Sequence, residues 1–433
     1  MEKIKGVNLG NWLVLEKWML PELFAGTGTE DEVWLNRKMN PAELKEKMKE
    51  HRDTFITEKD FAFIKDQGIG LLRIPVPYFI FGDREPFHGC IEYLDKAFDW
   101  AEKYGLQILI DLHTVPGSQN GYDNGGITGV CKWCKNPQEV EFALTVLERL
   151  AERYKNRTGL YGIEVLNEPI SFLVYATAPS TGKAVDKEEA KGSGYVPLPF
   201  LENFYRDAYK RLRKILPEDK TIVFHDGFRL RHWGRFFRKE NMKNVVLDTH
   251  IYIFAMESFV PIHKPWVYQI YIKSQQRLIR RIQKDVPVVV GEWCICNKYA
   301  EKTDSGMSAE AAAKRRRERY LEIAALQLQA WSEAKGWIYW SYQFKPNRKE
   351  PLDEKWKESW DFSRCVENGW IEFGIRQRCD TEPLADGNDR VCSSGVCGMS
   401  DLHRWKHCMP SCPGQLRTHR SKRSCRSSLQ FLL

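Results

Sequence analysis

Gly162-Ile163-Glu164-Val165-Leu166-Asn167-Glu168-Pro169 is the stretch that decides the fold and the chemistry expected of this chain. An apolar run typical of a buried strand leads into an Asn-Glu pair, and a proline then stops it. Because proline can continue neither a sheet ladder nor a helix, it fixes the Glu168 carboxylate at a strand end. A carboxylate there, beside the Asn167 amide, suits general acid/base chemistry, which predicts a second carboxylate at the end of a later strand.

Glu292 is that second carboxylate, because Val288-Val289-Val290-Gly291-Glu292-Trp293 is again an apolar run that ends in a glutamate. Two carboxylates at one mouth are the arrangement of a glycosidase: one protonates the leaving oxygen, and the other attacks the sugar or activates water. Arg73, His113 and His250 end other strand-like runs, which favours a site over isolated structural glutamates. Retention of configuration would require a separation of ~5 Å between the two carboxyl groups.

Strand-like apolar runs alternate with amphipathic helical runs over roughly the first 340 residues. The runs are continuous rather than alternating, as expected of parallel strands buried on both faces, and this predicts an α/β fold, a (β/α)8 TIM barrel. A doubly wound open sheet is the alternative, but no glycine-rich phosphate loop follows the first strand. The predicted strands are 6–14, 71–75, 107–113, 162–168, 221–225, 244–250, 287–292 and 336–340, and the predicted helices are 58–68, 91–105, 136–156, 199–216, 233–241, 267–284 and 309–334.

Two insertions, 26–57 and 171–197, follow strand ends and therefore fall on the face of a barrel where loops carry function. The second is rich in glycine and lysine, and we expect a flexible lid there. The barrel is expected to end near residue 372. We therefore predict a catalytic domain over 1–372 and a separate tail over 373–433.

Composition supports a folded body with a cleft for a sugar or an aryl group. Apolar residues make up 42% of the 433 residues and aromatic residues 12%, which argues against disorder. The chain has 15 Trp and 17 Tyr. Flat amphipathic rings stack on the C–H faces of sugars while their polar groups form hydrogen bonds, although about half of them should simply fill the core.

Charge and hydropathy bear on partners and location. The net charge is +8. The residues from Phe373 on hold ten Lys/Arg against five Asp/Glu, so +5 of this charge lies in the tail. The rest of the chain is close to balanced, which gives no case for nucleic-acid binding. No run reaches the ~18 apolar residues of a membrane helix. Met1 leads directly into structure-like sequence with no apolar signal segment, so the protein is expected to be cytoplasmic, or secreted with its signal peptide already removed.

Over residues 1 to about 372 the chain resembles the retaining β-glycosidases of glycoside hydrolase family 5. In order along the chain, the matching motifs are Arg73 in Leu-Arg-Ile-Pro, His113 in Asp-Leu-His, Asn167-Glu168-Pro169, His250 and Tyr252 in Thr-His-Ile-Tyr, Gly291-Glu292, and Trp340. The resemblance implies that Glu168 is the acid/base and Glu292 the nucleophile, with no metal or organic cofactor. It also implies that Arg73 hydrogen-bonds Glu292 and keeps it ionised. In such a pair the acid needs a raised pKa and the nucleophile a depressed one.

The same resemblance assigns supporting roles. Asn167 would hold the sugar 2-hydroxyl, a contact that strengthens toward the transition state. His113 and His250 would bind hydroxyls or position the acid/base, and Tyr252 would orient the nucleophile. Trp340 would form a platform beneath the sugar in the −1 subsite.

Finer features are similar to the exo-β-1,3-glucanase branch of the family. They are the stretch from Gly6 to Trp18 and the stretch from Asp111 through Ser118-Gln119-Asn120-Gly121. There, Glu16 and loop residues such as Asn120 would close one end of the pocket around a terminal glucose, which gives exo-action and cleavage of aryl or alkyl glucosides. Glu16 could instead be a surface charge.

Substrate and function class stay open at this point. The expected partner is a β-glucan, an oligosaccharide or a glucoside, with no nucleic acid or membrane and an unknown oligomeric state. The insertions depart from the exo-glucanase branch, so an endo-β-1,4-glucanase or mannanase is the alternative enzyme. A carbohydrate-binding barrel without turnover is the alternative from another class.

Weaker signals have simpler explanations. Cys131 and Cys134 have C-x-x-C spacing without a second pair to complete a zinc site, so they, like Cys294 and Cys296, are expected to be free thiols. The basic segment 314–319 is expected to be a solvated helix face. In the tail, Cys379, Cys392, Cys397, Cys408, Cys412 and Cys425 fit no disulfide or metal framework. This favours disordered, non-native sequence over a small stabilised module.

Overall fold

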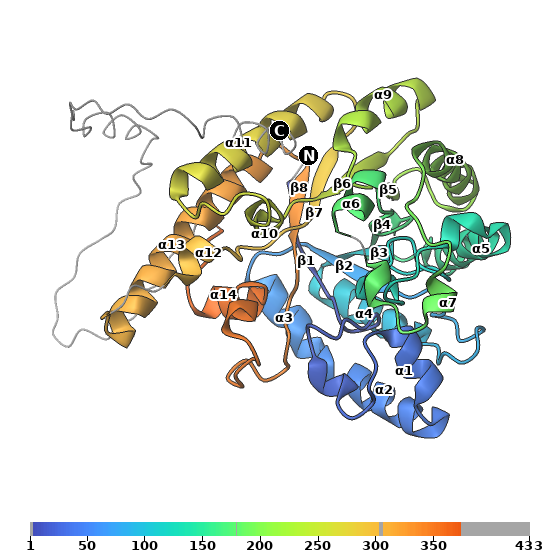
Figure 1. The fold of residues 1–433 in the computed structure, drawn as a ribbon. Helices are drawn as coiled ribbons and strands as arrows, with labels where there is room; N and C mark the ends of the chain where they lie inside the picture. Colours follow the sequence, from blue (N-terminus) through green and yellow to red (C-terminus); the bar gives the residue numbers. More distant parts are fainter. Residues whose placement is uncertain (1–2, 179, 303–305, 374–433) are drawn as a thin grey trace, which may run out of the picture. The chain divides into compact units, whose positions relative to one another are not determined.

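Eight parallel strands close into a barrel in the computed structural model, which describes residues 3–178, 180–302 and 306–373. Each strand pairs with the next one in the sequence, and β1 pairs with β8 to close the ring (Figure 1). The strands are β1 (Ile4–Asn8), β2 (Leu71–Val76), β3 (Gln107–Leu112), β4 (Leu160–Glu164), β5 (Thr221–His225), β6 (Val245–His250), β7 (Val288–Glu292) and β8 (Gly336–Tyr339). The predicted (β/α)8 TIM barrel is confirmed.

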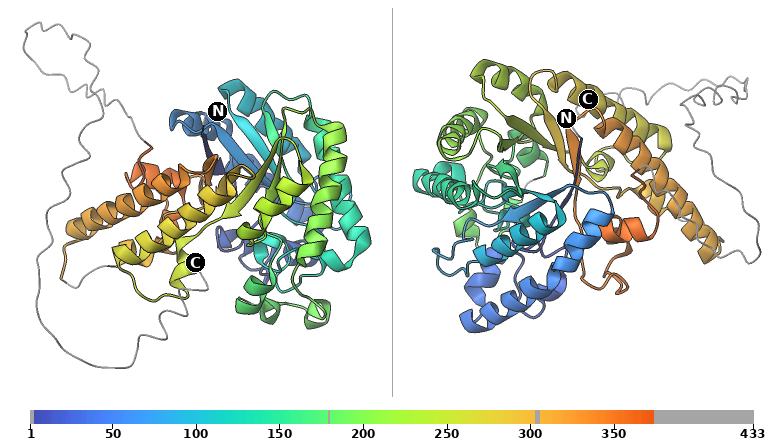
Figure 2. Two further views of the ribbon diagram at one scale, coloured as in Figure 1. Left: turned by 90° about the horizontal axis from the view of Figure 1, so that it is seen from above. Right: turned by 180° about the vertical axis from the view of Figure 1, so that it is seen from behind.

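Helices surround the strands on the outside, as the two views of Figure 2 show. Those that follow the barrel rhythm are α3 (Glu58–Asp66), α4 (Ile91–Tyr104), α5 (Pro137–Tyr154), α8 (Leu198–Ile215), α9 (Leu230–Glu240), α11 (Pro265–Ile282) and α13 (Ala309–Trp331), close to the predicted ranges. The others lie in connections: α1 (Glu32–Lys38), α2 (Pro41–Phe55), α6 (Phe172–Thr177), α7 (Lys187–Ala190), α10 (Ile253–Glu257), α12 (Lys298–Glu301) and α14 (Phe362–Glu367). None of the described helices is long and apolar enough to cross a membrane.

The strands build the barrel in layers, because side chains two residues apart point the same way. Six buried aliphatic residues from six strands pack together as an apolar layer: Leu71, Leu109, Val223, Val246, Val289 and Ile338. Two positions further along their strands, the corresponding side chains of β2, β3 and β6 are Arg73, Asp111 and Asp248, all fully buried. The apolar layer thus supports a charged layer, and the strand ends lie beyond it.

The first predicted strand ends too late. The sequence predicted strand structure over 6–14, but β1 ends at Asn8 and residues 9–14 form a buried loop. This run is apolar because the first insertion covers it, not because it belongs to the sheet: the Trp12 indole N–H, for example, donates to the carbonyl of Arg52 in α2. Burial and strand formation have different causes here.

The second insertion is attached to the barrel at several points, although the sequence predicted a flexible lid. Arg37 and Glu189 form a bidentate ion pair, with N···O distances of 2.8 and 3.0 Å. The amide of Gly194 donates to the carbonyl of Cys131, whose own amide donates to the Ser193 hydroxyl. These contacts join the part of 171–197 that the structure describes to the connections after β1 and β3.

Two of the weaker sequence signals are resolved by packing. The six body cysteines, Cys90, Cys131, Cys134, Cys294, Cys296 and Cys365, carry free thiols, as expected. In the basic segment of α13, Arg316 is buried rather than solvated, because it pairs with Glu301 at 2.7 Å and lies over the ring of Trp370. The predicted tail from residue 374 on, with its six cysteines, lies outside the described residues.

Candidate active site

Arg73 on β2 links the charged layer to the mouth of the barrel. Its Nε donates to Glu164 Oε2 at 2.7 Å, and its Nη2 lies 3.1 Å from Asp111 Oδ2. On the mouth side, Nη1 donates to Glu292 Oε1 at 3.0 Å and Nη2 donates to Asn167 Oδ1 at 2.9 Å. The guanidinium is fully buried, so all of these contacts are made away from water. The structure therefore contains the predicted Arg73–Glu292 hydrogen bond.

Glu292 is the last residue of β7, where the sequence placed it. Both carboxylate oxygens accept a hydrogen bond: Oε1 from Arg73, and Oε2 from the Tyr252 hydroxyl at 2.8 Å. Gly291 before it has no room for a side chain, since a Cβ there would lie 1.9 Å from Asp248 Oδ2. The direction of the Glu292 carboxylate is thus fixed by Arg73 within β2 and by Tyr252 just after β6.

Glu168 does not end a strand as predicted, because β4 stops at Glu164. The chain leaves the sheet, and Glu168 adopts a φ of 43°, a left-handed conformation that is uncommon for a residue with a side chain. Backbone hydrogen bonds on both sides hold this conformation: Asn167 N donates to Leu112 O, and Ile170 N to Gln119 O. The carboxylate is directed into the mouth from this irregular segment.

His250 bridges the two glutamates. Its Nδ1 lies 2.8 Å from Glu168 Oε1 and 3.3 Å from Glu292 Oε2, so these two oxygens are at most about 6.1 Å apart, the sum of the two distances. This upper limit on the distance between the two facing oxygens is compatible with the roughly 5–5.5 Å between the carboxyl groups of retaining glycosidases. The arrangement can place one carboxylate at the anomeric carbon and the other at the leaving oxygen.

The pKa values of the two glutamates run opposite to the expectation for an acid and a nucleophile. Burial raises the pKa of Glu168, but the hydrogen bond from His250 and its charge outweigh burial and lower this pKa to about 2. Burial raises the pKa of Glu292 despite the opposing charges of His250 and Arg73. Burial lowers the pKa of His250, yet Glu292 and Asp248 raise it well above its ordinary value. Without substrate, the mobile proton is therefore on His250 and Glu168 is ionised.

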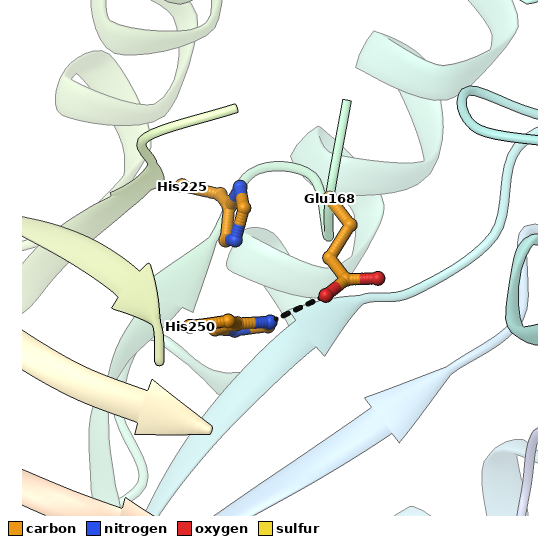
Figure 3. Close-up of side chains that lie close together, drawn as sticks. All are labelled: Glu168, His225 and His250. Atoms are coloured by element: carbon orange, nitrogen blue, oxygen red, sulfur yellow. Dashed lines mark hydrogen bonds and ion pairs between the residues drawn. The ribbon is translucent and has the colours of Figure 1, made fainter. Parts of the chain in front are cut away.

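His225 on β5 is a site residue that sequence reasoning did not single out. Its Nδ1 accepts from the Gly227 amide at 2.9 Å, and its ring contacts the His250 ring edge to face at 4.3 Å. Burial and the charge of His250 lower the pKa of His225 well below its ordinary value. Its Nε2 is buried and has no hydrogen-bond partner among the described residues. Figure 3 shows both imidazole rings on the same side of the Glu168 carboxylate.

The site contains a group of three possible metal ligands: Glu168, His225 and His250. One ligand atom from each of them lies within 4.8 Å of the other two. Such a set could hold a cation, as could Glu164 with Asp248 and His250. Metal ligands must be deprotonated, however, and His250 lies among carboxylates that stabilise its proton. The donor set therefore fits a metal only in competition with that proton.

Glu16 belongs to the site and is not a surface charge. Its side chain is buried and accepts from the Trp18 indole N–H at 2.7 Å. Burial raises the pKa of Glu16 well above its ordinary value, and the charges of Asp123, Glu292 and Glu168 add to this. Burial also raises the pKa of Asp123, to about 6. Two carboxyl groups that sequence reasoning did not pair thus share one end of the site.

The loop after β3 reaches Glu168 through Asn124, a residue that the sequence analysis did not single out. Asn120 is buried and donates to Asn124 Oδ1 at 2.9 Å, and Asn124 in turn donates to Glu168 Oε2 at 2.9 Å. Asn120 is therefore a supporting residue one step from the glutamate. The polar composition of the loop was a signal for this contact, but its sequence did not show which amide makes it.

His113 and Trp340 form one wall. Their rings are nearly parallel, with centroids 5.7 Å apart. His113 Nδ1 is 2.5 Å from Asp111 Oδ2, and its Nε2 is 3.3 Å from the amide nitrogen of Asn167. The structure thus brings all ten predicted site residues to one end of the barrel, with Glu16 and Asn120 at its edge.

Comparisons with known proteins agree with this geometry. The family model described as cellulase (glycosyl hydrolase family 5) matches residues 35–345. The probable glucan 1,3-beta-glucosidase A of Emericella nidulans is 33% identical over 381 residues, which cover 79% of this chain and 85% of that protein. The glucan 1,3-beta-glucosidase of Blumeria graminis is 34% identical over 303 residues, 67% of this chain and 64% of that protein. The crystal structure of a rutinosidase from Aspergillus niger aligns with a TM-score of 0.66 at 22% identity, covering 86% of this chain and 98% of that one, and shows the shared fold.

Proposed function

The chain belongs to glycosyl hydrolase family 5 and is a glycoside hydrolase, and on that premise we propose that it cleaves β-glucosidic bonds with retention of configuration. The action proposed is that of an exo-β-1,3-glucanase or a β-glucosidase on glucans or on aryl and alkyl glucosides. The observation that carries the proposal is the bridging of Glu168 and Glu292 by His250, which limits the distance between their facing oxygens to about 6.1 Å, the sum of 2.8 and 3.3 Å. The names of the relatives support glucose as the sugar.

Retention proceeds in two displacements. In the first, Glu292 attacks the anomeric carbon, Glu168 gives its proton to the leaving oxygen, and a glycosyl-enzyme ester forms on Glu292. In the second, Glu168 takes a proton from water, the water oxygen attacks the anomeric carbon, and Glu292 leaves as a carboxylate. Arg73 and Tyr252 stabilise that carboxylate through the hydrogen bonds at 3.0 and 2.8 Å.

The first displacement requires the proton to be on Glu168, whereas the ligand-free site holds it on His250. A sugar in the −1 subsite excludes water from Glu168, which favours the neutral form of the carboxyl group. The proton then needs to move only along the 2.8 Å hydrogen bond from Nδ1 of His250 to Oε1 of Glu168. In this proposal His250 stores the proton in the absence of substrate, and Glu168 carries it during the reaction.

The buried carboxyl group of Glu16 beside the two glutamates supports the proposed exo-action. The buried Glu16 and the half-buried Asp123 place two carboxyl groups where hydroxyls of a terminal glucose would be recognised. Asn167, fixed by Arg73, is available for the 2-hydroxyl, and Trp340 for stacking beneath the ring. An endo-acting enzyme needs this end open, so the buried Glu16 is the feature that disfavours the endo-glucanase or mannanase alternative.

Two measurements test the proposal. Proton NMR of early products from an aryl β-glucoside should show β-glucose first, whereas α-glucose first would contradict retention. Product analysis on laminarin and carboxymethyl-cellulose should give monomeric glucose from laminarin alone. Mixed oligomers from either polymer would contradict exo-action.

A further inference from the structure

The exposed large hydrophobic side chains of the described residues are not scattered over the barrel. All of them lie in the stretches that follow two strands, β4 and β6. Four follow β4: Phe172, Leu173, Val185 and Tyr195; four follow β6: Phe254, Phe259, Trp266 and Ile270. Their exposed fractions run from 36% for Tyr195 to 62% for Phe172. Only the connection after β5 separates the two groups along the barrel rim.

Both groups continue directly from the proposed catalytic residues. On the β4 side, Phe172 begins α6 shortly after Glu168. On the β6 side, the ring of Phe254 in α10 lies 5.3 Å from that of Tyr252, which donates to Glu292. Figure 1 shows α6 and α10 near the β4–β7 side of the barrel. An exposed apolar surface next to a site marks a place for a ligand rather than random surface composition.

Three of the eight exposed side chains, which together form the apolar rim, are held by ring contacts before any ligand binds. Phe172 and Tyr195 contact each other edge to face at 5.2 Å, across the second insertion. Phe254 packs on Trp360 at 5.2 Å. Ordered side chains lose less conformational entropy when a ligand covers them, so they favour binding.

The chemistry of the rim fits hydrocarbon better than a further sugar. Sugars stack on flat aromatic faces, but Leu173, Val185 and Ile270 have no such face. Aliphatic and aromatic side chains together suit an apolar chain or ring system, which gains by leaving water and has no directional requirement. The mixture therefore indicates an apolar group on the leaving-group side of the scissile bond.

A membrane surface is the competing occupant. On α11, Trp266 and Ile270 share a helix face with Lys273 and Arg277, a pattern that also suits an anionic membrane. Membrane contact through this helix alone would leave the apolar positions after β4 without a role, however. Here half of the apolar positions lie on the other side of the β5 connection, and the two groups flank the site.

We propose that the aglycone of the preferred substrate is a long hydrocarbon or another extended apolar group, which lies between these two rim segments. The enzyme would then act on amphiphilic β-glucosides. This inference rests on the proposed hydrolysis of β-glucosides and specifies the class of leaving group.

A series of n-alkyl β-glucosides tests the inference. Ethyl and octyl glucosides release ethanol and octanol, whose oxygens have similar basicity, so chain length reports binding and not leaving-group chemistry. A fully buried methylene is worth roughly a factor of four in binding, and partial burial on the rim less. We expect kcat/KM, measured below the critical micelle concentration, to rise at least about tenfold from ethyl to octyl, mainly through KM. A rise below about twofold overturns the aglycone assignment.

The series also separates this inference from the proposed function. If no β-glucoside is cleaved, neither ethyl, octyl nor aryl, the proposed function fails. If aryl glucosides are cleaved and chain length has no effect, only the present inference fails.

Substitutions on each rim segment complete the test. Leu173→Ser and Ile270→Ser should each lower the octyl-to-ethyl ratio of kcat/KM at least about twofold, and a ratio is insensitive to general loss of active enzyme. Arg281→Ser, an exposed position further along α11, is the matched control and should leave the ratio unchanged. Unchanged ratios in both rim variants overturn the proposal. Weaker binding of both variants to phosphatidylglycerol vesicles, with unchanged ratios, would assign the rim to membrane docking instead.

Discussion

The ends of β4 and β7 present the same residue type to the same mouth but hold it differently. Glu292 is the last residue of its strand, and both oxygens accept from fixed donors, Arg73 and Tyr252. Glu168 lies beyond its strand in a left-handed conformation and is held by His250 and Asn124. A nucleophile needs one unchanging direction, whereas an acid that later acts as a base must exchange protons with its neighbours. The regular strand end suits the first role and the irregular segment suits the second.

Replacing Glu292 should have the largest effect, because it removes the bond-forming atom itself. We expect Glu292→Gln to lower kcat on an aryl β-glucoside on the order of 10^4-fold or more. Circular dichroism would verify that the variant is folded. Substantial residual turnover would mean that Glu292 is not the nucleophile. The difference in how the two glutamates are held would then not correspond to a difference in their roles.

Replacing Glu168 should show a loss that depends on the leaving group. Glu168→Gln should lower kcat/KM about 10^2- to 10^4-fold for alkyl glucosides, which need a protonated leaving oxygen. For a dinitrophenyl glucoside, whose leaving group needs little protonation, the loss in that first displacement should be much smaller. Equal losses for both leaving groups would contradict the acid role. The same pattern in the Glu292 variant would mean that the two roles are exchanged.

The low pKa of Glu168 predicts how stability depends on pH. In the unfolded chain the pKa of this carboxyl group is near the ordinary glutamate value of 4.5, and in the folded protein it is lowered to about 2. The folded state therefore keeps it ionised where the unfolded state binds a proton, so its contribution is present above pH 4.5 and is lost as pH falls toward 2. The difference of about 2.5 pH units corresponds to about 3 kcal/mol.

Denaturant unfolding of the parent and of Glu168→Gln between pH 3 and 6 measures this contribution. The free energy of unfolding should rise more steeply with pH in the parent, because only the parent has this carboxylate. Parallel curves would contradict the ion pair with His250 as the resting state of the site. Carboxyl groups that do not interact with Glu168 cancel in the difference, whereas Glu16 and Glu292, whose pKa values its charge raises, contribute to it.

The sequence allowed the barrel and most of the mouth to be predicted, for a physical reason. Parallel strands buried on both faces are continuous apolar runs, so Val288 to Glu292 could be recognised as a strand that ends in a carboxylate. The end of β4 looked the same, but its last residues leave the sheet because of hydrogen bonds to Leu112 and Gln119 that no local pattern encodes. The sequence analysis expected the higher pKa on Glu168 and the lower one on Glu292. The opposite order in the structure depends on the position of His250 between the two glutamates, which the sequence does not show.

The smallest expected effect concerns Asn124, the contact that sequence reasoning did not assign. Its amide donates to Glu168 Oε2 at 2.9 Å, while His250 occupies the other oxygen. Asn124→Ala should remove a hydrogen bond worth about 1 kcal/mol that orients Glu168, which lowers kcat/KM about fivefold. The loss should again be larger for alkyl than for dinitrophenyl glucosides. Asn120→Ala removes the residue that holds Asn124, so the same dependence on the leaving group should appear in weaker form. A loss in Asn124→Ala that is uniform across leaving groups would show that the loop positions the sugar and not the acid, and that Glu168 depends on His250 alone.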